Sequence, residues 1–127
     1  MKQILLSLGL VLGLLTLGVA CDYGKSGGGA PAADSALMSP ANSAGRMDND
    51  EGVGHYKQGH WDVSEGHFRK AIKADPNLAE AHYNLGLALD KMGKHDEATT
   101  EFKKAAQLAP TDPAIKDSAI LKKHLAM

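Results

Sequence analysis

The chain has almost no cysteine and almost no net charge, and each scarcity excludes a class of function. Its one thiol among 127 residues is Cys21. A single cysteine cannot close an intramolecular disulfide, and a cysteine-based metal site needs several ligands close together. The formal net charge at pH 7 is −1, from 14 Lys and Arg against 15 Asp and Glu. This balance lacks the basic surface that nucleic-acid binding requires, so no nucleic-acid partner is expected.

Motifs for catalysis and for cofactors are missing as well. The sequence has no glycine-rich phosphate-binding loop, no zinc-ligand spacing and no nucleophile elbow. Six histidines stand out, but His60 and His67, the most suggestive pair, do not share one predicted helix in ligand spacing. We therefore expect no enzyme, no resident cofactor and no metal. A histidine-based metal or haem carrier remains a minor alternative.

The one long hydrophobic run lies at the amino terminus. It spans Ile4 to Ala20 behind Lys2, a length of 17 residues that includes several glycines. A positive start, an apolar core and small residues before a break are the parts of a secretory signal peptide. Because the run is short for a membrane span and glycine weakens a helix, a cleaved signal is preferred over a retained anchor.

The exit of this run, Val19-Ala20-Cys21, resembles the lipobox of bacterial lipoproteins. In that motif the cysteine is acylated and becomes the first residue of the mature protein. The sequence departs from it at Gly18, where leucine is usual. The resemblance implies a lipid on Cys21, membrane attachment in the bacterial cell envelope and a domain that faces the periplasm or another extracytoplasmic space. A plain cleaved signal and an uncleaved anchor are the alternatives.

A linker follows the cysteine. From Asp22 to Ala44 the composition shifts to Gly, Ser, Ala, Pro, Asn and Asp. Such a stretch buries too little apolar surface to offset the entropy of ordering it. It predicts a flexible linker with a mean reach of roughly 25–30 Å. The chain thus divides into a signal peptide at 1–20, a lipidated cysteine with its linker at 21–44 and a folded domain at 45–127.

The folded domain contains an internal repeat. Sliding the sequence by 34 residues superposes eight identical pairs. These are Gly52 with Gly86, Lys57 with Lys91, Gly59 with Gly93, Asp62 with Asp96, Phe68 with Phe102, Lys70 with Lys104, Ala71 with Ala105 and Pro76 with Pro110. A fixed period of this length indicates a solenoid of helix pairs.

The second copy, residues 79–112, resembles a tetratricopeptide repeat. It carries Leu85-Gly86, Gly93, Ala98, Phe102, Ala105 and Pro110 at the family's positions and departs at His82 and Leu89. The first copy, 45–78, matches well from Tyr56 onward and is weaker before it. The resemblance implies an all-α fold, a short α-solenoid of two helix pairs plus a C-terminal capping helix.

Turn and cap residues place the helices at about 46–58, 62–74, 78–92 and 96–108. Gly59 and Gly93 suit helix C-termini, and Asp62 and Asn77 suit N-terminal caps. A capping helix is predicted over 113–126, starting at Pro113 after Asp112. Its expected apolar stripe is Ala114, Ile115, Ser118, Ala119, Leu121, Leu125 and Ala126, with Ile120 off the stripe. Two repeats are fewer than solenoids usually need, so self-association or stabilisation by a partner is also considered.

The family pattern places a concave binding groove along the first helix of each pair. Mapped onto this sequence, its lining is Arg46, Asn49, Val53, Tyr56, Lys57, Glu80, Tyr83, Asn84, Leu87, Asp90 and Lys91. Asn84 matches one member of the carboxylate clamp of chaperone-binding relatives, whereas Asn49 and Val53 depart from it. Chaperone-tail binding is therefore not predicted.

The mixed lining favours a protein segment over a small molecule. The resemblance implies a membrane-anchored adaptor or scaffold that binds a protein or peptide partner in the envelope. A self-assembling structural module without a separate client is the alternative, so a homo-oligomer is also considered.

Overall fold

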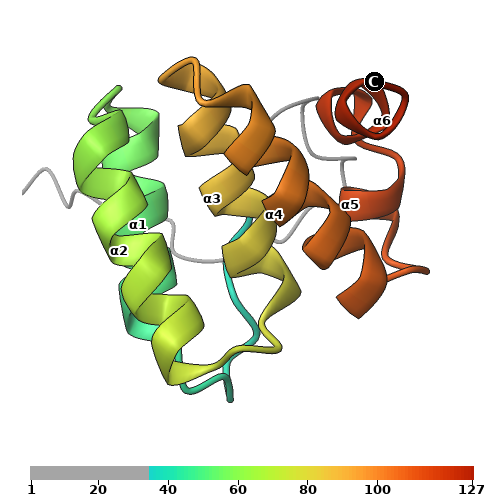
Figure 1. Cartoon of the computed structure of the whole chain (residues 1–127). Coiled ribbons are helices and arrows are strands. Elements are labelled where there is room, and N and C mark those ends of the chain that lie inside the picture. Colours follow the sequence, from blue (N-terminus) through green and yellow to red (C-terminus); the bar gives the residue numbers. More distant parts are fainter. Residues whose placement is uncertain (1–34) are drawn as a thin grey trace, which may run out of the picture.

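Two helix hairpins form the body of the fold in the computed structural model, which describes residues 35–127 (Figure 1). The first hairpin pairs α1 (Arg46–Lys57) with α2 (Trp61–Ala74), and the second pairs α3 (Ala79–Lys91) with α4 (His95–Leu108). Two short helices, α5 (Pro113–Lys116) and α6 (Ala119–Leu125), follow at the C-terminal end. The predicted all-α helical repeat is thus confirmed. The predicted signal peptide, Cys21 and the linker up to residue 34 lie outside the described residues.

The two hairpin turns have the same construction. Gly59 and Gly93 follow α1 and α3 with φ of +80° and +76°, a left-handed conformation that non-glycine residues rarely adopt. Each glycine N–H donates to a carbonyl in the last turn of its helix, Tyr56 O and Asp90 O, at 3.0 Å. These backbone bonds close the helix ends, as the sequence predicted.

Close contact between the helices of each pair requires a residue without a side chain. A Cβ placed on Gly52 would lie 2.6 Å from Phe68 Cε1, and one on Gly86 would lie 2.8 Å from Phe102 Cδ1. Both phenylalanine rings are fully buried. Glycine on the first helix therefore lets the aromatic ring of the second helix lie directly against the backbone.

Helix α3 is the centre of the core. Ala79 and every residue from 81 to 89 are buried, while Glu80 is half-buried. The helix packs against α2, α4 and part of α1. One hydrophobic cluster runs from Val53 of α1 to Leu121 of α6, so the two hairpins share a core, and Ala71, Leu78 and Ala81 form a small second cluster.

The predicted single capping helix is wrong, because the chain breaks at Ser118. Ser118 adopts ψ of 129°, and its hydroxyl accepts from Leu121 N at 3.3 Å, which starts α6 as a new helix. The first part matches the prediction, since Asp112 caps Ala114 N at 2.8 Å with Pro113 at the first helical position.

The break resets the phase of the apolar stripe. Ile115, Ser118 and Leu121 are buried as predicted, but Leu125 is 43% exposed and Ala119 and Ala126 are exposed too. His124 is buried instead, and Ile120 packs partly against the core. The two other predicted caps are also wrong, because the N-caps of α2 and α3 are His60 and Leu78, without a side-chain hydrogen bond.

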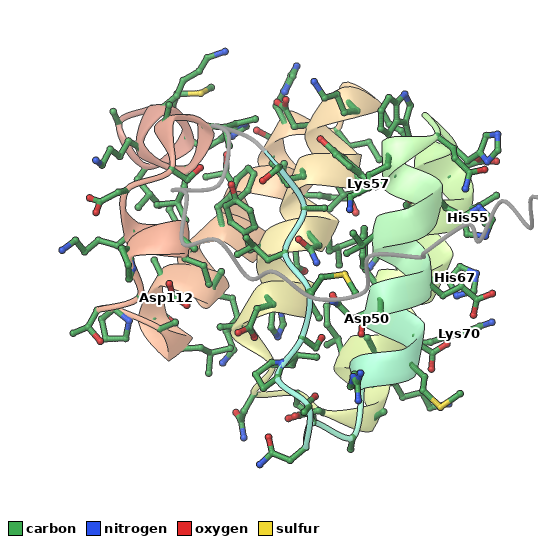
Figure 2. All side chains as sticks on the ribbon, turned by 180° about the vertical axis from the view of Figure 1, so that it is seen from behind. Asp50, His55, Lys57, His67, Lys70 and Asp112 are labelled. Atoms are coloured by element: carbon green, nitrogen blue, oxygen red, sulfur yellow. The ribbon has the colours of Figure 1, made fainter. Side chains whose placement is uncertain are left out.

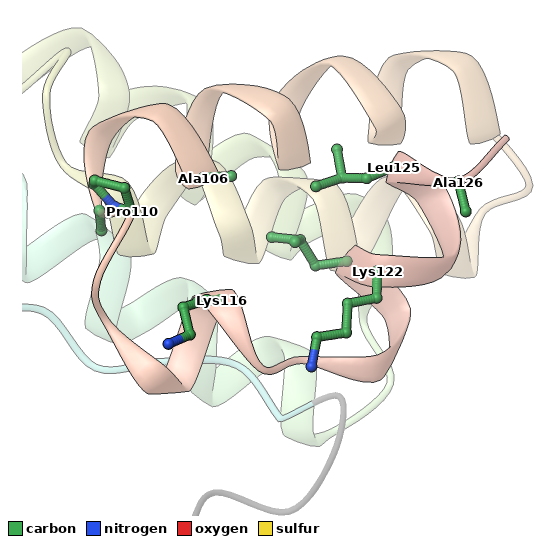
Figure 3. A pocket seen from close by; sticks show the side chains of 8 residues that line it. Ala106, Pro110, Lys116, Lys122, Leu125 and Ala126 are labelled. Atoms are coloured by element: carbon green, nitrogen blue, oxygen red, sulfur yellow. The ribbon is translucent and has the colours of Figure 1, made fainter.

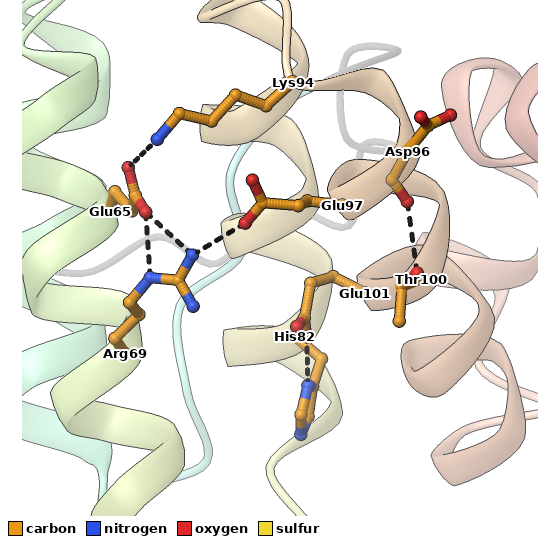
Figure 4. Close-up of polar contacts among 8 residues, drawn as sticks. All are labelled: Glu65, Arg69, His82, Lys94, Asp96, Glu97, Thr100 and Glu101. Atoms are coloured by element: carbon orange, nitrogen blue, oxygen red, sulfur yellow. Dashed lines mark hydrogen bonds and ion pairs between the residues drawn. The ribbon is translucent and has the colours of Figure 1, made fainter.

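An ion-pair network joins α2 to α4 on the outer face (Figure 4). Glu65 binds Arg69 at 2.8 Å and Lys94 at 3.0 Å, and Arg69 reaches Glu97 at 3.2 Å. Burial alone would raise the pKa of Glu65, but the hydrogen bonds and charges of Arg69 and Lys94 outweigh it and lower that pKa. None of the described helices is long and apolar enough to cross a membrane.

Candidate functional site

The predicted groove residues lie on or at the ends of α1 and α3, and more than half of them are buried. Asn49, Val53, Tyr56, Tyr83, Asn84 and Leu87 are buried. Glu80 and Asp90 are half-buried, and Arg46, Lys57 and Lys91 are exposed. Val53, Tyr56, Tyr83 and Leu87 are buried as members of the core cluster, whereas Asn49 and Asn84 are covered by another part of the chain.

The cover is the chain's own segment of residues 35–40. It has no regular secondary structure and runs along the face formed by α1 and α3, next to Asp50 (Figure 2). The side chains of Ala36 and Leu37 pack against the core cluster. The linker was predicted to extend to residue 44. Its part at 35–40 already lies against the folded domain.

Two asparagines hold the main chain of Leu37 in this groove. Asn84 Oδ1 accepts from Leu37 N at 2.7 Å, and Asn84 Nδ2 donates to Leu37 O at 2.7 Å. Asn49 Nδ2 donates to the same carbonyl at 2.9 Å, and Asn49 Oδ1 accepts from Asn84 Nδ2 at 2.8 Å. Both asparagine side chains are fully buried. We call these two residues the asparagine clamp.

Further polar contacts hold the chain on the C-terminal side of the clamp. Ser39 N donates to Asp50 Oδ1 at 3.0 Å, and Ser43 Oγ donates to Asp75 Oδ2 at 3.2 Å. Arg46 lies 3.4 Å from the other oxygen of Asp50. The backbone of the segment is therefore bound in the manner of a peptide ligand, through main-chain atoms.

Tyr83 is not presented to the groove as the family pattern implied. Its hydroxyl donates to Ser118 Oγ at 2.9 Å in the buried interior, and its ring centroid lies 5.7 Å from that of Phe102. The side chain is 1% exposed. Tyr83 therefore links α3 to the start of α6 and supports the core.

The histidines gather in ways that the sequence did not reveal. At the C-terminal end of α3, Asp90 Oδ1 lies 2.9 Å from His95 Nδ1 and 3.0 Å from His124 Nε2. Burial would raise the pKa of Asp90, but the hydrogen bonds and charges of His124 and His95 outweigh it and lower that pKa. The other nitrogen of the His124 ring lies 2.7 Å from Thr99 Oγ1. His82, where the family has a larger residue, bonds Glu101 and Pro76 O.

An apolar hollow of about 420 Å³ lies at the C-terminal end of the solenoid (Figure 3). Ala106 and Ala109 of the α4 end, Leu121 and Leu125 line it, and Lys116 and Lys122 stand beside it.

Comparison with known families agrees with this geometry. A family model described as Tetratricopeptide repeat matches residues 49–113, about half of the chain. The chain belongs to the tetratricopeptide repeat family. Such repeats are protein–protein interaction modules and typically carry no catalytic activity, so protein binding is the class of function to which this tetratricopeptide domain belongs. No curated protein sequence matches the chain.

The family match omits the two features that distinguish this tetratricopeptide domain. It begins at Asn49 and ends at Pro113, so it excludes the segment in the groove and α6. The only sequence signal for the segment is the apolar pair Leu37-Met38 in an otherwise polar and small-residue stretch. That signal is weak, because two apolar residues alone do not predict order.

Proposed function

We propose that this domain binds an extended segment of a protein partner in the groove of α1 and α3, at the place that residues 35–40 occupy. The observation that carries the proposal is the asparagine clamp, which holds both main-chain polar groups of Leu37. Extended peptides that bind along a surface gain much of their affinity from such main-chain bonds. The segment is then an internal ligand that a partner displaces.

The test uses the full chain and a synthetic peptide of residues 33–42 as the probe. A variant with residues 35–40 deleted should bind the labelled peptide in an anisotropy titration, and the parent chain should bind it much more weakly. Adding Asn84→Ala to the deletion variant should abolish binding. Adding Lys103→Ala, an exposed change on α4, should leave binding intact.

Two results would overturn the proposal. One is equal peptide binding by the deletion variant with and without Asn84→Ala. The other is loss of the helical circular dichroism signal on deletion, because the segment would then be an integral part of the fold and not a ligand.

We further propose that the domain works as an adaptor anchored to a bacterial membrane by a lipid on Cys21. The support is the sequence Val19-Ala20-Cys21 at the end of a hydrophobic run. Cys21→Ser should move the protein from the detergent-extracted membrane fraction to the soluble envelope fraction, or leave an unprocessed precursor. Intact mass of the mature protein should show a lipid on its first residue, and an unmodified residue there would refute this role.

The apolar hollow favours a second candidate, self-association through the end of the solenoid. Leu125 at its edge is 43% exposed and Met127 is 83% exposed, and apolar surface of this kind favours burial against a partner. Mass measurement over a range of concentrations should show an oligomer that Leu125→Glu dissociates. A monomer at every concentration would exclude this candidate and leave the groove proposal untouched.

A further inference from the structure

A second cluster of histidines lies on the outer edge of the first hairpin. Glu51 and His55 are four residues apart on α1, and His67 of α2 lies beside them (Figure 2). His60, in the turn between the two helices, brings its Nδ1 to 3.5 Å from His55 Nδ1. One potential ligand atom from each of Glu51, His55 and His67 lies within 4.8 Å of the others.

We infer that this cluster is a binding site for a transition-metal cation of the zinc class, with Glu51, His55 and His67 as ligands and His60 within reach as a fourth. Imidazole nitrogens with a carboxylate are the donor set that suits Zn²⁺, Ni²⁺ and Cu²⁺. The sequence did not suggest it because the ligands come from two helices and a turn, and the one pair in helical spacing is a glutamate with a histidine.

The buried nitrogen of His67 supports this inference. His67 Nδ1 is shielded from solvent and has no hydrogen-bond partner within the described residues. Carboxylate oxygens of Asp48 and Glu51 lie 3.7 Å away, beyond hydrogen-bonding distance. Two ligands of a tetrahedral zinc ion, bound at about 2.0–2.1 Å, lie roughly 3.4 Å apart. The spacing therefore fits a shared cation better than a hydrogen bond.

The Asp90 cluster provides the contrast within the same molecule. There, both ring nitrogens of His124 and the Nδ1 of His95 have partners at 2.7 to 3.0 Å. Three of the four ring nitrogens in that network thus already have hydrogen-bond partners. In the Glu51 cluster the rings of His55 and His67 are stacked at 5.3 Å, so a modest ring rotation and a swing of the exposed Glu51 side chain would bring the ligands onto one ion.

A cation at this site would fasten α1 to α2. Its ligands come from both helices, and binding to the folded arrangement alone stabilises it by mass action. We therefore expect zinc to raise the melting temperature of the protein.

The experiment titrates the full-length, untagged, chelator-stripped protein in detergent with Zn²⁺ against a chromophoric chelator. One zinc per chain and a higher melting temperature are expected. His67→Gln or His55→Gln should lower the zinc affinity by at least about tenfold. His95→Gln, in the other cluster, and Cys21→Ser should leave the affinity unchanged. Because His55 is half-buried at the edge of the hairpin, its variant keeps the test valid if His67→Gln fails to fold.

Three results would overturn the inference. The first is no stoichiometric zinc binding. The second is loss of binding in His95→Gln or Cys21→Ser with retention in His55→Gln. The third is equal competition by Ca²⁺, since an oxygen-seeking cation would indicate only a general attraction to acidic side chains.

Discussion

At the residue scale, the buried side chain of Asn84 binds the main chain of the segment at residues 35–40. Its carbonyl oxygen accepts one hydrogen bond and its amide group donates two, all between 2.7 and 2.8 Å. A buried polar side chain is tolerated when its bonding capacity is used in this way. In the sequence, the same residue is a polar position on the predicted concave face that matches one member of an otherwise incomplete carboxylate clamp.

Replacing Asn84 should release the segment. Asn84→Ala leaves Leu37 N and part of the bonding capacity of Leu37 O and Asn49 without a partner, and each unsatisfied buried group costs about 1–3 kcal/mol. We expect a lower free energy of unfolding and faster amide hydrogen exchange at Leu37. Asn77→Ala is the matched control, because Asn77 is exposed and its side chain caps no described helix. Equal exchange at Leu37 in both variants would disprove the role of the clamp.

Glu80 should destabilise the domain at neutral pH. Burial raises its pKa above 4.5, and the carboxylates of Asp112 and Asp75 add to the rise, although a hydrogen bond to its own backbone opposes it. Because the folded-state pKa exceeds the unfolded one, stability is lost as the pH rises through the folded-state value. Glu80→Gln should therefore be more stable than the parent at pH 7, and the difference should disappear below about pH 4.5. Denaturant midpoints at both pH values measure this, and equal midpoints at pH 7 would contradict it.

At the scale of elements, α1 contains more glycine than any other helix of residues 35–127. Gly52 and Gly54 lie two residues apart within it and face different surroundings. Gly52 is pressed against Phe68, whereas a Cβ on Gly54 would meet nothing within 4 Å. The same substitution should thus have opposite effects at the two positions.

Gly54→Ala should raise the free energy of unfolding by about 0.5–1 kcal/mol, because alanine loses less backbone entropy in a helix than glycine. Gly52→Ala should lower it by about 1–3 kcal/mol, since the new methyl group overpacks the contact with the Phe68 ring. Urea titrations of the two variants provide the comparison. Destabilisation by both would mean that Gly54 also packs against a neighbour.

The hairpins could be predicted from the sequence, and the C-terminal helices could not. In a repeat, each helix boundary is indicated twice. Gly59 and Gly93 lie one 34-residue period apart, so each supports the assignment of the other as a turn. Residues 113–126 have no second copy to compare with. The predicted apolar stripe includes Ser118. In the structure its hydroxyl caps α6 and accepts a hydrogen bond from Tyr83, which lies 35 positions away in the sequence.

The two hairpins and α6 share one main core, so truncating one large core side chain should destabilise the whole described domain. Phe102 of α4 is fully buried and contacts Gly86 and Tyr83 of α3 and His124 of α6. Phe102→Ala should cost roughly 3–5 kcal/mol, a large part of the stability of a small domain. Circular dichroism should show the loss of most of the cooperative melt. A melt like that of the parent would show that Phe102 does not stabilise the core and that the repeat register is wrong.

The sequence predicted the helices that line the groove and did not predict that a segment of the chain covers it. Family spacing placed Asn49 and Asn84 on one face, and their side chains are hydrogen-bonded to each other at 2.8 Å. It could not indicate that residues 35–40 lie on that face, because Gly, Ser, Ala and Pro in a linker give no periodic signal. Likewise, the histidine clusters depend on contacts between elements, and no spacing along the chain encodes them.

The asparagine clamp forms its hydrogen bonds with the N–H and C=O groups of Leu37. Every residue except proline offers both groups, so the clamp distinguishes an extended chain from a folded one far better than it distinguishes one side chain from another. Leu37→Ala should stay in the groove, and Leu37→Pro should leave it. Partner segments that bind in the proposed way would then share a conformation, an accessible extended stretch without proline at the clamped position. They would not share a consensus motif that a sequence search could find.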